Sequence, residues 1–162
     1  MDNDSGTARR DKAIWRHAFA AQPCENIEAW SLLEKDLPEE LTWRKSEPSY
    51  YEYAIYMALS AYAACGKQAS GISLGRAAHE LGESSRNRFT RVERSRTISE
   101  LWANTKSLLR MVTAAQGTGI DYALLATSLV SWQYDRMSTI RQWEKDYYDK
   151  VPARSNRAKA KE

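Results

Sequence analysis

Residues 97–112, Thr97-Ile-Ser-Glu-Leu-Trp-Ala-Asn-Thr-Lys-Ser-Leu-Leu-Arg-Met-Val112, decide the fold class of this 162-residue chain. Side chains that suit a core recur there every three or four residues, which is the period of one face of an α-helix. This stripe consists of Ile98, Leu101, Trp102, Thr105, Leu108, Leu109 and Val112. Thr97 and Glu100 have the spacing of a capping box, which starts a helix. The stretch predicts an amphipathic helix with one buried face.

Similar patterns fill most of the chain. The sequence has only seven glycines and four prolines, a balance that favours helices. Ser49 and Glu52 form a second expected capping box, and the apolar helix after them should be central. Ser84 is expected to cap an arginine-rich helix, and Ile27 and Met137 are expected to face the core. The approximate predicted helices are 8–21, 25–35, 49–65, 74–81, 84–94, 97–112, 121–134 and 135–150.

These patterns predict an all-α fold, a compact single-domain helical bundle of about seven to eight helices. The domain is expected over residues 8–150, after a flexible start at 1–7. Residues 151–162 are basic and lack large apolar side chains, which indicates a disordered tail. No apolar signal core or 18-residue apolar run is present, so no membrane segment is expected and a cytoplasmic location is the default.

Positive charge is concentrated in the middle of the chain. Residues 86–96 contain Arg86, Arg88, Arg91, Arg94 and Arg96, offset within the cluster only by a glutamate. Residues 1–65 hold seven basic and eleven acidic side chains, whereas residues 66–111 hold nine and four. Because guanidinium groups stay charged and match phosphate oxygens, this basic face at 71–110 favours a phosphate backbone over a merely solvated surface.

Catalytic and metal-binding patterns are sparse. His17 and His79 are the only histidines, and neither belongs to a metal-binding motif. Cys24 and Cys65 are interpreted as free, buried thiols. The segment from Gly71 to Gly75 has the glycines of a phosphate loop but lacks the lysine and hydroxyl that should follow. We therefore expect no catalytic residue, no metal and no cofactor.

Aromatic residues could also serve a nucleic acid by stacking on bases. Most of them fall on apolar stripes, where packing is the simpler role. Trp43, followed by Arg44 and Lys45 in a predicted loop, is the one pairing expected to face a ligand.

Several stretches together resemble one known family, the small subunit of the type I-E CRISPR Cascade complex (the CasB family). The resemblance covers residues 71–148, about half of the chain. It rests on Gly71-Ile72-Ser73-Leu74-Gly75-Arg76-Ala77, the arginine-rich helix, Arg96-Thr97, Leu108-Leu109 and the segment Leu124–Trp132. The Gly-Ile-Ser-Leu-Gly-Arg string is its most specific part.

This resemblance implies an all-helical, non-catalytic subunit that sits as a pair along the crRNA-guided complex, beside the other Cascade subunits. In that family the small subunits help to hold the guide–target hybrid and the displaced strand of the target DNA, which favours the R-loop. The nucleic-acid-binding positions that it implies are Arg76, Arg88, Arg91, Arg94, Arg96, Lys106, Arg110 and Arg136.

Two other functions are compatible with these residues. A stand-alone helical DNA-binding regulator would dimerise by itself and prefer a palindromic site, but no compact recognition-helix pattern is evident. A protein–protein scaffold would instead pair its basic face with acidic subunits, including the acidic N-terminal half of another copy.

Overall fold

The computed structural model describes residues 3–42 and 46–149, and within them the chain is an all-α bundle, as predicted. The predictions for residues 43–45 and 151–162 concern parts of the chain outside these ranges. The α-helices are α1 (Asn3–Ala20), α2 (Ile27–Asp36), α3 (Tyr50–Cys65), α4 (Leu74–Leu81), α5 (Arg86–Arg94), α6 (Ile98–Ala114), α7 (Tyr122–Tyr134) and α8 (Arg136–Tyr148). The short 3-10 helices are η1 (Glu39–Leu41) and η2 (Glu83–Ser85).

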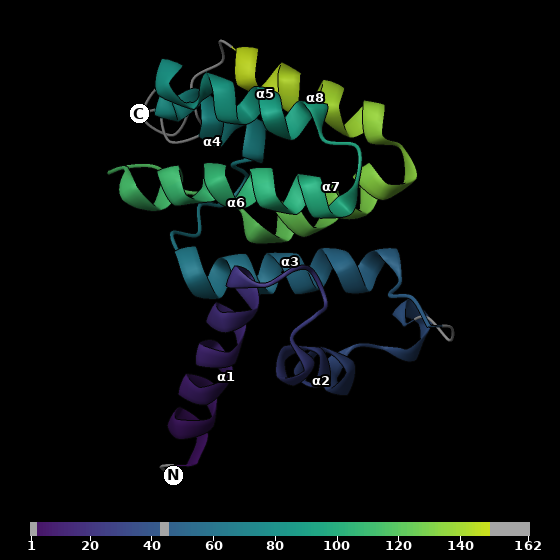
Figure 1. The fold of residues 1–162 in the computed structure, drawn as a ribbon. Coiled ribbons are helices and arrows are strands. Elements are labelled where there is room, and N and C mark those ends of the chain that lie inside the picture. The colour runs from purple at the N-terminus through teal and green to yellow at the C-terminus, as the bar shows by residue number, and fades with distance from the viewer. Residues whose placement is uncertain (1–2, 43–45, 150–162) are drawn as a thin grey trace, which may run out of the picture.

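The helix α3 lies at the centre of the bundle, as its apolar sequence predicted (Figure 1). Its capping box is confirmed, because Ser49 Oγ accepts the Glu52 N–H and the Glu52 carboxylate accepts the Ser49 N–H. On one side Met57 joins the main core with α6 and α7. On the other, Tyr56 meets Trp15 of α1 edge to face, with ring centroids 5.3 Å apart. The two cores therefore share α3 as a common wall.

The apolar stripe of α6 is confirmed in the main core, where Leu101, Trp102 and Leu108 are fully buried. Its start differs from the predicted reciprocal box. Thr97 Oγ1 accepts the Glu100 N–H, but the Glu100 carboxylate accepts the N–H of Arg96 rather than that of Thr97. The Glu100 carboxylate therefore binds the backbone N–H of the residue before Thr97, so the cap reaches one residue further back along the chain.

Four local predictions are wrong. α1 begins at Asn3 rather than near residue 8, so the helix starts earlier than expected even though it includes Gly6. Ser85 rather than Ser84 precedes α5, because a turn of 3-10 helix intervenes. Ile27 is 73% exposed at the first position of α2. Met137 is 45% exposed, also within the first turn of its helix. First-turn residues near a bundle edge have fewer neighbours than their spacing suggests.

Gly75 allows α4 to pack closely against α8. A Cβ atom at this position would lie 2.1 Å from the carbonyl oxygen of Trp143, so the two helices approach too closely for any side chain there. The glycine that resembled part of a phosphate loop is therefore a helix-packing residue. Gly71, at φ +78, begins the turn before α4 and donates its N–H to Asp121 Oδ2 at 2.8 Å.

Gly75→Ala should destabilise the fold by about 1–3 kcal/mol or more, because the backbone of α8 must move to admit the methyl group. Gly6→Ala in α1 is the control, since a Cβ atom added there would have nothing within 4 Å, and it should be neutral or slightly stabilising. Urea unfolding of both variants measures the difference. Equal stability of the two variants would contradict the close approach.

No described helix combines the length and the hydropathy that a membrane span requires.

Candidate nucleic-acid interface

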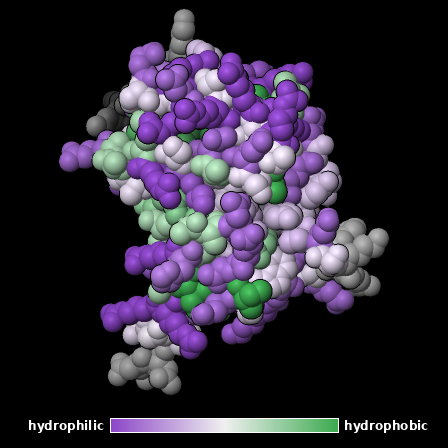
Figure 2. Space-filling model, in the orientation of Figure 1, coloured by the Kyte–Doolittle hydropathy of each residue, from purple (hydrophilic) through white to green (hydrophobic). Residues whose placement is uncertain are grey.

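The helix α5 is fixed by its apolar side and exposes its arginines. Phe89 and Val92 are fully buried in the main core, and Phe89 stacks on Tyr147 of α8 with centroids 4.8 Å apart. Successive helix residues are about 100° apart, so the positions opposite this pair must face solvent. Figure 2 shows mostly hydrophilic side chains over the upper part of this view, where α5 lies with α4 and α8 in Figure 1.

Five of the predicted binding residues are exposed on this surface, which we call the α5–α6 face. They are Arg88, Arg91, Arg94, Arg96 and Arg110. Within the described residues, none of the five forms an ion pair with a carboxylate. Like charges so close together repel one another, and none of these five arginines has a described ion pair that would relieve the repulsion. The face is therefore ready to accept an anionic partner.

Hydrogen bonds hold α5 against α6 and fix the side chain of Arg88 on this face. Arg88 Nε donates to Ser107 Oγ at 3.0 Å, which ties its guanidinium to α6. Asn104 Nδ2 on α6 donates to the Arg91 carbonyl and to Ser95 Oγ, at 3.2 and 2.9 Å. The two helices are thus cross-linked along their length. Because the two helices are already fixed relative to each other, their backbones lose little conformational entropy when a partner binds.

Two predicted cations have partners within the fold. Arg76 forms an ion pair with Glu80 at 3.5 Å and donates to the Asp149 carbonyl at 3.0 Å. Arg136 donates from Nε to the Ser95 carbonyl at 2.7 Å and from Nη2 to the Glu93 carbonyl at 2.8 Å. Those carbonyls end α5, so Arg136 caps that helix and neutralises its negative end. Neither arginine lies on the α5–α6 face.

Lys106 is also held by the fold. Its side chain is half-buried, donates to the Ala21 carbonyl at 3.4 Å, and lies over the rings of Phe19 and Trp102. Burial, followed by the nearby charge of Arg110, lowers the pKa of this lysine. Lys106 joins the end of α1 to α6, while exposed Arg110 lies beside it.

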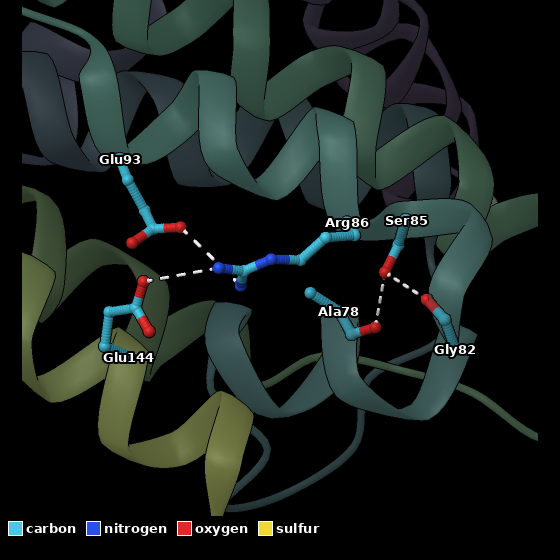
Figure 3. A network of polar contacts seen from close by, with 6 residues as sticks. All are labelled: Ala78, Gly82, Ser85, Arg86, Glu93 and Glu144. Carbon is cyan, nitrogen blue, oxygen red and sulfur yellow. Dashed lines mark hydrogen bonds and ion pairs between the residues drawn. The ribbon is translucent and has the colours of Figure 1, made fainter.

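Arg86, the first arginine of the cluster, turns inward between α5 and α8 (Figure 3). Its guanidinium lies 4.0 Å from both Glu93 and Glu144, and 4.9 Å from the ring centroid of Tyr147. Beside it, the buried Ser85 hydroxyl donates to the Ala78 and Gly82 carbonyls, linking α5 to the end of α4. The sequence places Arg86 and Glu93 on one helix face, seven residues apart, but Glu144 comes from another helix.

Glu93 faces the carboxylate of Glu144 in this network. Burial, a hydrogen bond to Glu144 and repulsion by its charge raise the pKa of Glu93 from 4.5 to about 8, although Arg86 and Arg94 act in the opposite direction. At neutral pH a proton shared by the two carboxylates thus reduces the negative charge beside Arg86.

The described residues contain no group of three or more side chains that could hold a metal ion. Cys24 and Cys65 are unpaired and half-buried, rather than fully buried as predicted. Burial, followed by repulsion from Glu52 and Glu34, raises the pKa of Cys24 to about 12, so its thiol is a poor nucleophile. His17 and His79 are exposed.

Comparison with known proteins identifies the family. Residues 11–148 match the family of the CRISPR-associated protein Cse2. The chain belongs to the Cse2 family. This match confirms the resemblance to the CasB small subunits and extends it across the N-terminal half, which the sequence motifs did not cover. No curated protein matches the chain.

Three solved structures of the Cse2/CasB group share the fold. CasB from Thermus thermophilus is 24% identical with a TM-score of 0.70, and a CRISPR-associated protein of the Cse2 family, also from Thermus thermophilus, is 23% identical with a TM-score of 0.71. Each comparison covers 85% of this chain and 84% of the other. CasB from M. ruber is 17% identical with a TM-score of 0.68, covering 94% of this chain and 87% of the other.

The two groups of arginines should differ in their effect on stability. Arg136→Gln removes a cation that binds two carbonyls and should cost about 1–3 kcal/mol. Arg91→Gln should change the free energy of unfolding by less than about 0.5 kcal/mol, because the Arg91 side chain is exposed and unpaired in the described structure. Urea denaturation compares them. A larger loss for Arg91→Gln would show that the α5–α6 face supports the fold.

The Glu93–Glu144 pair predicts a pH dependence of stability. The folded state keeps a proton on Glu93 that the unfolded chain releases above its ordinary pKa of 4.5. Stability should therefore fall as pH rises from about 4.5 to about 8, and Glu93→Gln should reduce that fall. Denaturant unfolding at several pH values measures it. Glu83→Gln, at an exposed position on η2, is the charge-matched control. Parallel pH profiles for wild type and Glu93→Gln would contradict a raised pKa.

Proposed function

We propose that this chain is a non-catalytic subunit of a type I-E CRISPR surveillance complex and binds nucleic acid through the α5–α6 face. In this role it stabilises the guide RNA–target hybrid and the displaced DNA strand, alongside other Cascade subunits and a second copy of itself. The observation behind the proposal is the set of five exposed arginines without carboxylate partners on two cross-linked helices.

The size of the face suits a phosphate backbone. The 17-residue helix α6 is about 25 Å long, which equals the spacing of about seven phosphates along one strand of a duplex. Exposed guanidinium groups meet phosphate oxygens without reading bases. Replacing a DNA duplex by a guide–target hybrid is nearly balanced in free energy, so a few backbone contacts are enough to favour the open state.

This function includes no catalytic step by the chain. The poorly nucleophilic thiol of Cys24 and the exposed histidines do not form a catalytic arrangement within the described residues, and a charged binding face needs no cofactor. Sequence specificity belongs to guide pairing in this proposal, and the chain supplies electrostatic stabilisation.

A scaffold role is the second candidate, because the molecule also has an acidic region. Exposed carboxylates gather around α2 and η1, at Glu25, Glu28, Asp36, Glu39 and Glu40. A second copy could place this region against the α5–α6 face. In that arrangement the arginines would pair with protein, and the chain would not bind DNA at any salt concentration.

Arg91→Gln with Arg94→Gln should weaken binding to double-stranded DNA of unrelated sequence and reduce the steepness of its salt dependence. Each lost phosphate contact lowers the slope of log K against log salt by about 0.9, so the double variant should lose about 1.8. Fluorescence anisotropy titrations across salt measure this slope.

The control variant, Arg10→Gln with Lys35→Gln, removes the same charge from exposed positions on α1 and α2. It should keep the wild-type slope. If wild-type protein binds no DNA even at low salt, the nucleic-acid proposal fails and the scaffold is favoured. If the Arg91/Arg94 variant and the control variant reduce the slope of log K against log salt equally, the effect comes from net charge and the α5–α6 face is not the binding site.

A further inference from the structure

α1 carries a second group of exposed cations, although it belongs to the acidic half of the sequence. Arg9, Lys12 and Arg16 are exposed and lie at spacings of three and four residues, so they share one flank of the helix. Arg10 is exposed on another flank. α1 extends away from the other helices toward its N-terminus, and residues 5–10 are exposed on all sides (Figure 1).

The basic flank of α1 leads directly to the α5–α6 face. Phe19, one turn beyond Arg16, lies under Lys106 Nζ at 5.9 Å and under the Arg110 guanidinium at 5.8 Å. Arg16 Nε donates to the Ala63 carbonyl at 3.1 Å, in the last turn of α3. Arg110 is also close to this turn: burial raises the pKa of Cys65, while a hydrogen bond to Thr113 and the charge of Arg110 lower it. Arg16 and Arg110 therefore both lie near the end of α3.

Arg16 joins α1 to the end of α3 through its Nε, but no described ion pair or hydrogen bond gives the side chains of Arg9 and Lys12 a comparable role in stability. Lys12 and Arg16 are like charges one turn apart, a spacing that destabilises a helix. No described carboxylate pairs with Arg9, Lys12 or Arg16, and the half-buried Asp11 lies toward the packed side of α1. Arg9 also lies beyond the part of α1 that packs on α3, so it supports no core. An anionic partner would relieve the repulsion.

We infer that Arg9, Lys12 and Arg16 of α1 form a second phosphate-binding segment, continuous with the α5–α6 face through Arg110. This inference rests on the proposed function and defines the path of the nucleic acid. Arg9 lies ten residues before Phe19, so α1 lengthens the track by about 15 Å, or about four phosphates at duplex spacing. A phosphate backbone that crosses α5 and α6 continues along α1.

The test compares double-stranded DNA of about 8 and about 20 base pairs, because at duplex spacing the short duplex is covered by the α5–α6 face alone and the long one also reaches α1. The variant is Arg9→Gln with Lys12→Gln in the full chain. Both positions are exposed and glutamine is a good helix former, so the fold should not change. The control is again Arg10→Gln with Lys35→Gln, which removes equal charge off the track.

The variant should bind the longer duplex several-fold more weakly, with a slope of log K against log salt reduced by about 1.8, while its binding to the shorter duplex stays at the wild-type level. The control should match wild type on both lengths. If the Arg9→Gln, Lys12→Gln variant binds the longer duplex as tightly as the wild type does, the proposed α1 segment is overturned. The proposal for the α5–α6 face would remain. An equal loss of affinity for the longer duplex in the variant and in the control would also overturn the α1 segment. Failure of the wild-type chain to bind either length would overturn the proposed function as well.

Discussion

The packing of Phe89 against Tyr147 is the constraint on which the α5–α6 face depends. This stacked pair, with Val92 beside it, presses the apolar side of α5 into the core, and the remaining positions of the helix must then face outward. Arg136 from α8 and Asn104 from α6 bind backbone carbonyls near the end of α5 and stop it from rotating. The direction of the arginines is thus a consequence of the core.

The fold separates cations that stabilise it from cations that remain available to a partner. Arg76, Arg86, Lys106 and Arg136 are engaged by carboxylates, carbonyls or aromatic rings, and each joins segments distant in the sequence. The exposed arginines of the α5–α6 face lack such carboxylate partners among the described residues. A buried or half-buried charge needs a partner to offset its desolvation, whereas an exposed one keeps its hydration. This difference explains why similar arginines in one short segment have opposite roles.

The Cse2 fold also brings cations that are distant in the sequence to the same end of α3. α1 crosses the end of α3 and brings its basic flank to Arg110, although the N-terminal half of the chain is acidic overall. The acidic residues of that half gather around α2 and η1 instead. The placement of the helices therefore decides where positive and negative charges gather in this molecule. Counting the charged side chains of each sequence segment does not show this.

Sequence periodicity by itself determined the all-α class, the bounds of α4, the capping box of α3 and the buried stripe of α6, because these depend on residues within one or two turns. It also located the arginine cluster. Tertiary structure alone decided that Gly75 is a helix contact, that Arg86 turns inward toward Glu144, and that Ile27 and Met137 stay exposed. Each of these depends on which distant helix lies opposite the residue, and a helical repeat specifies a face without specifying its neighbour.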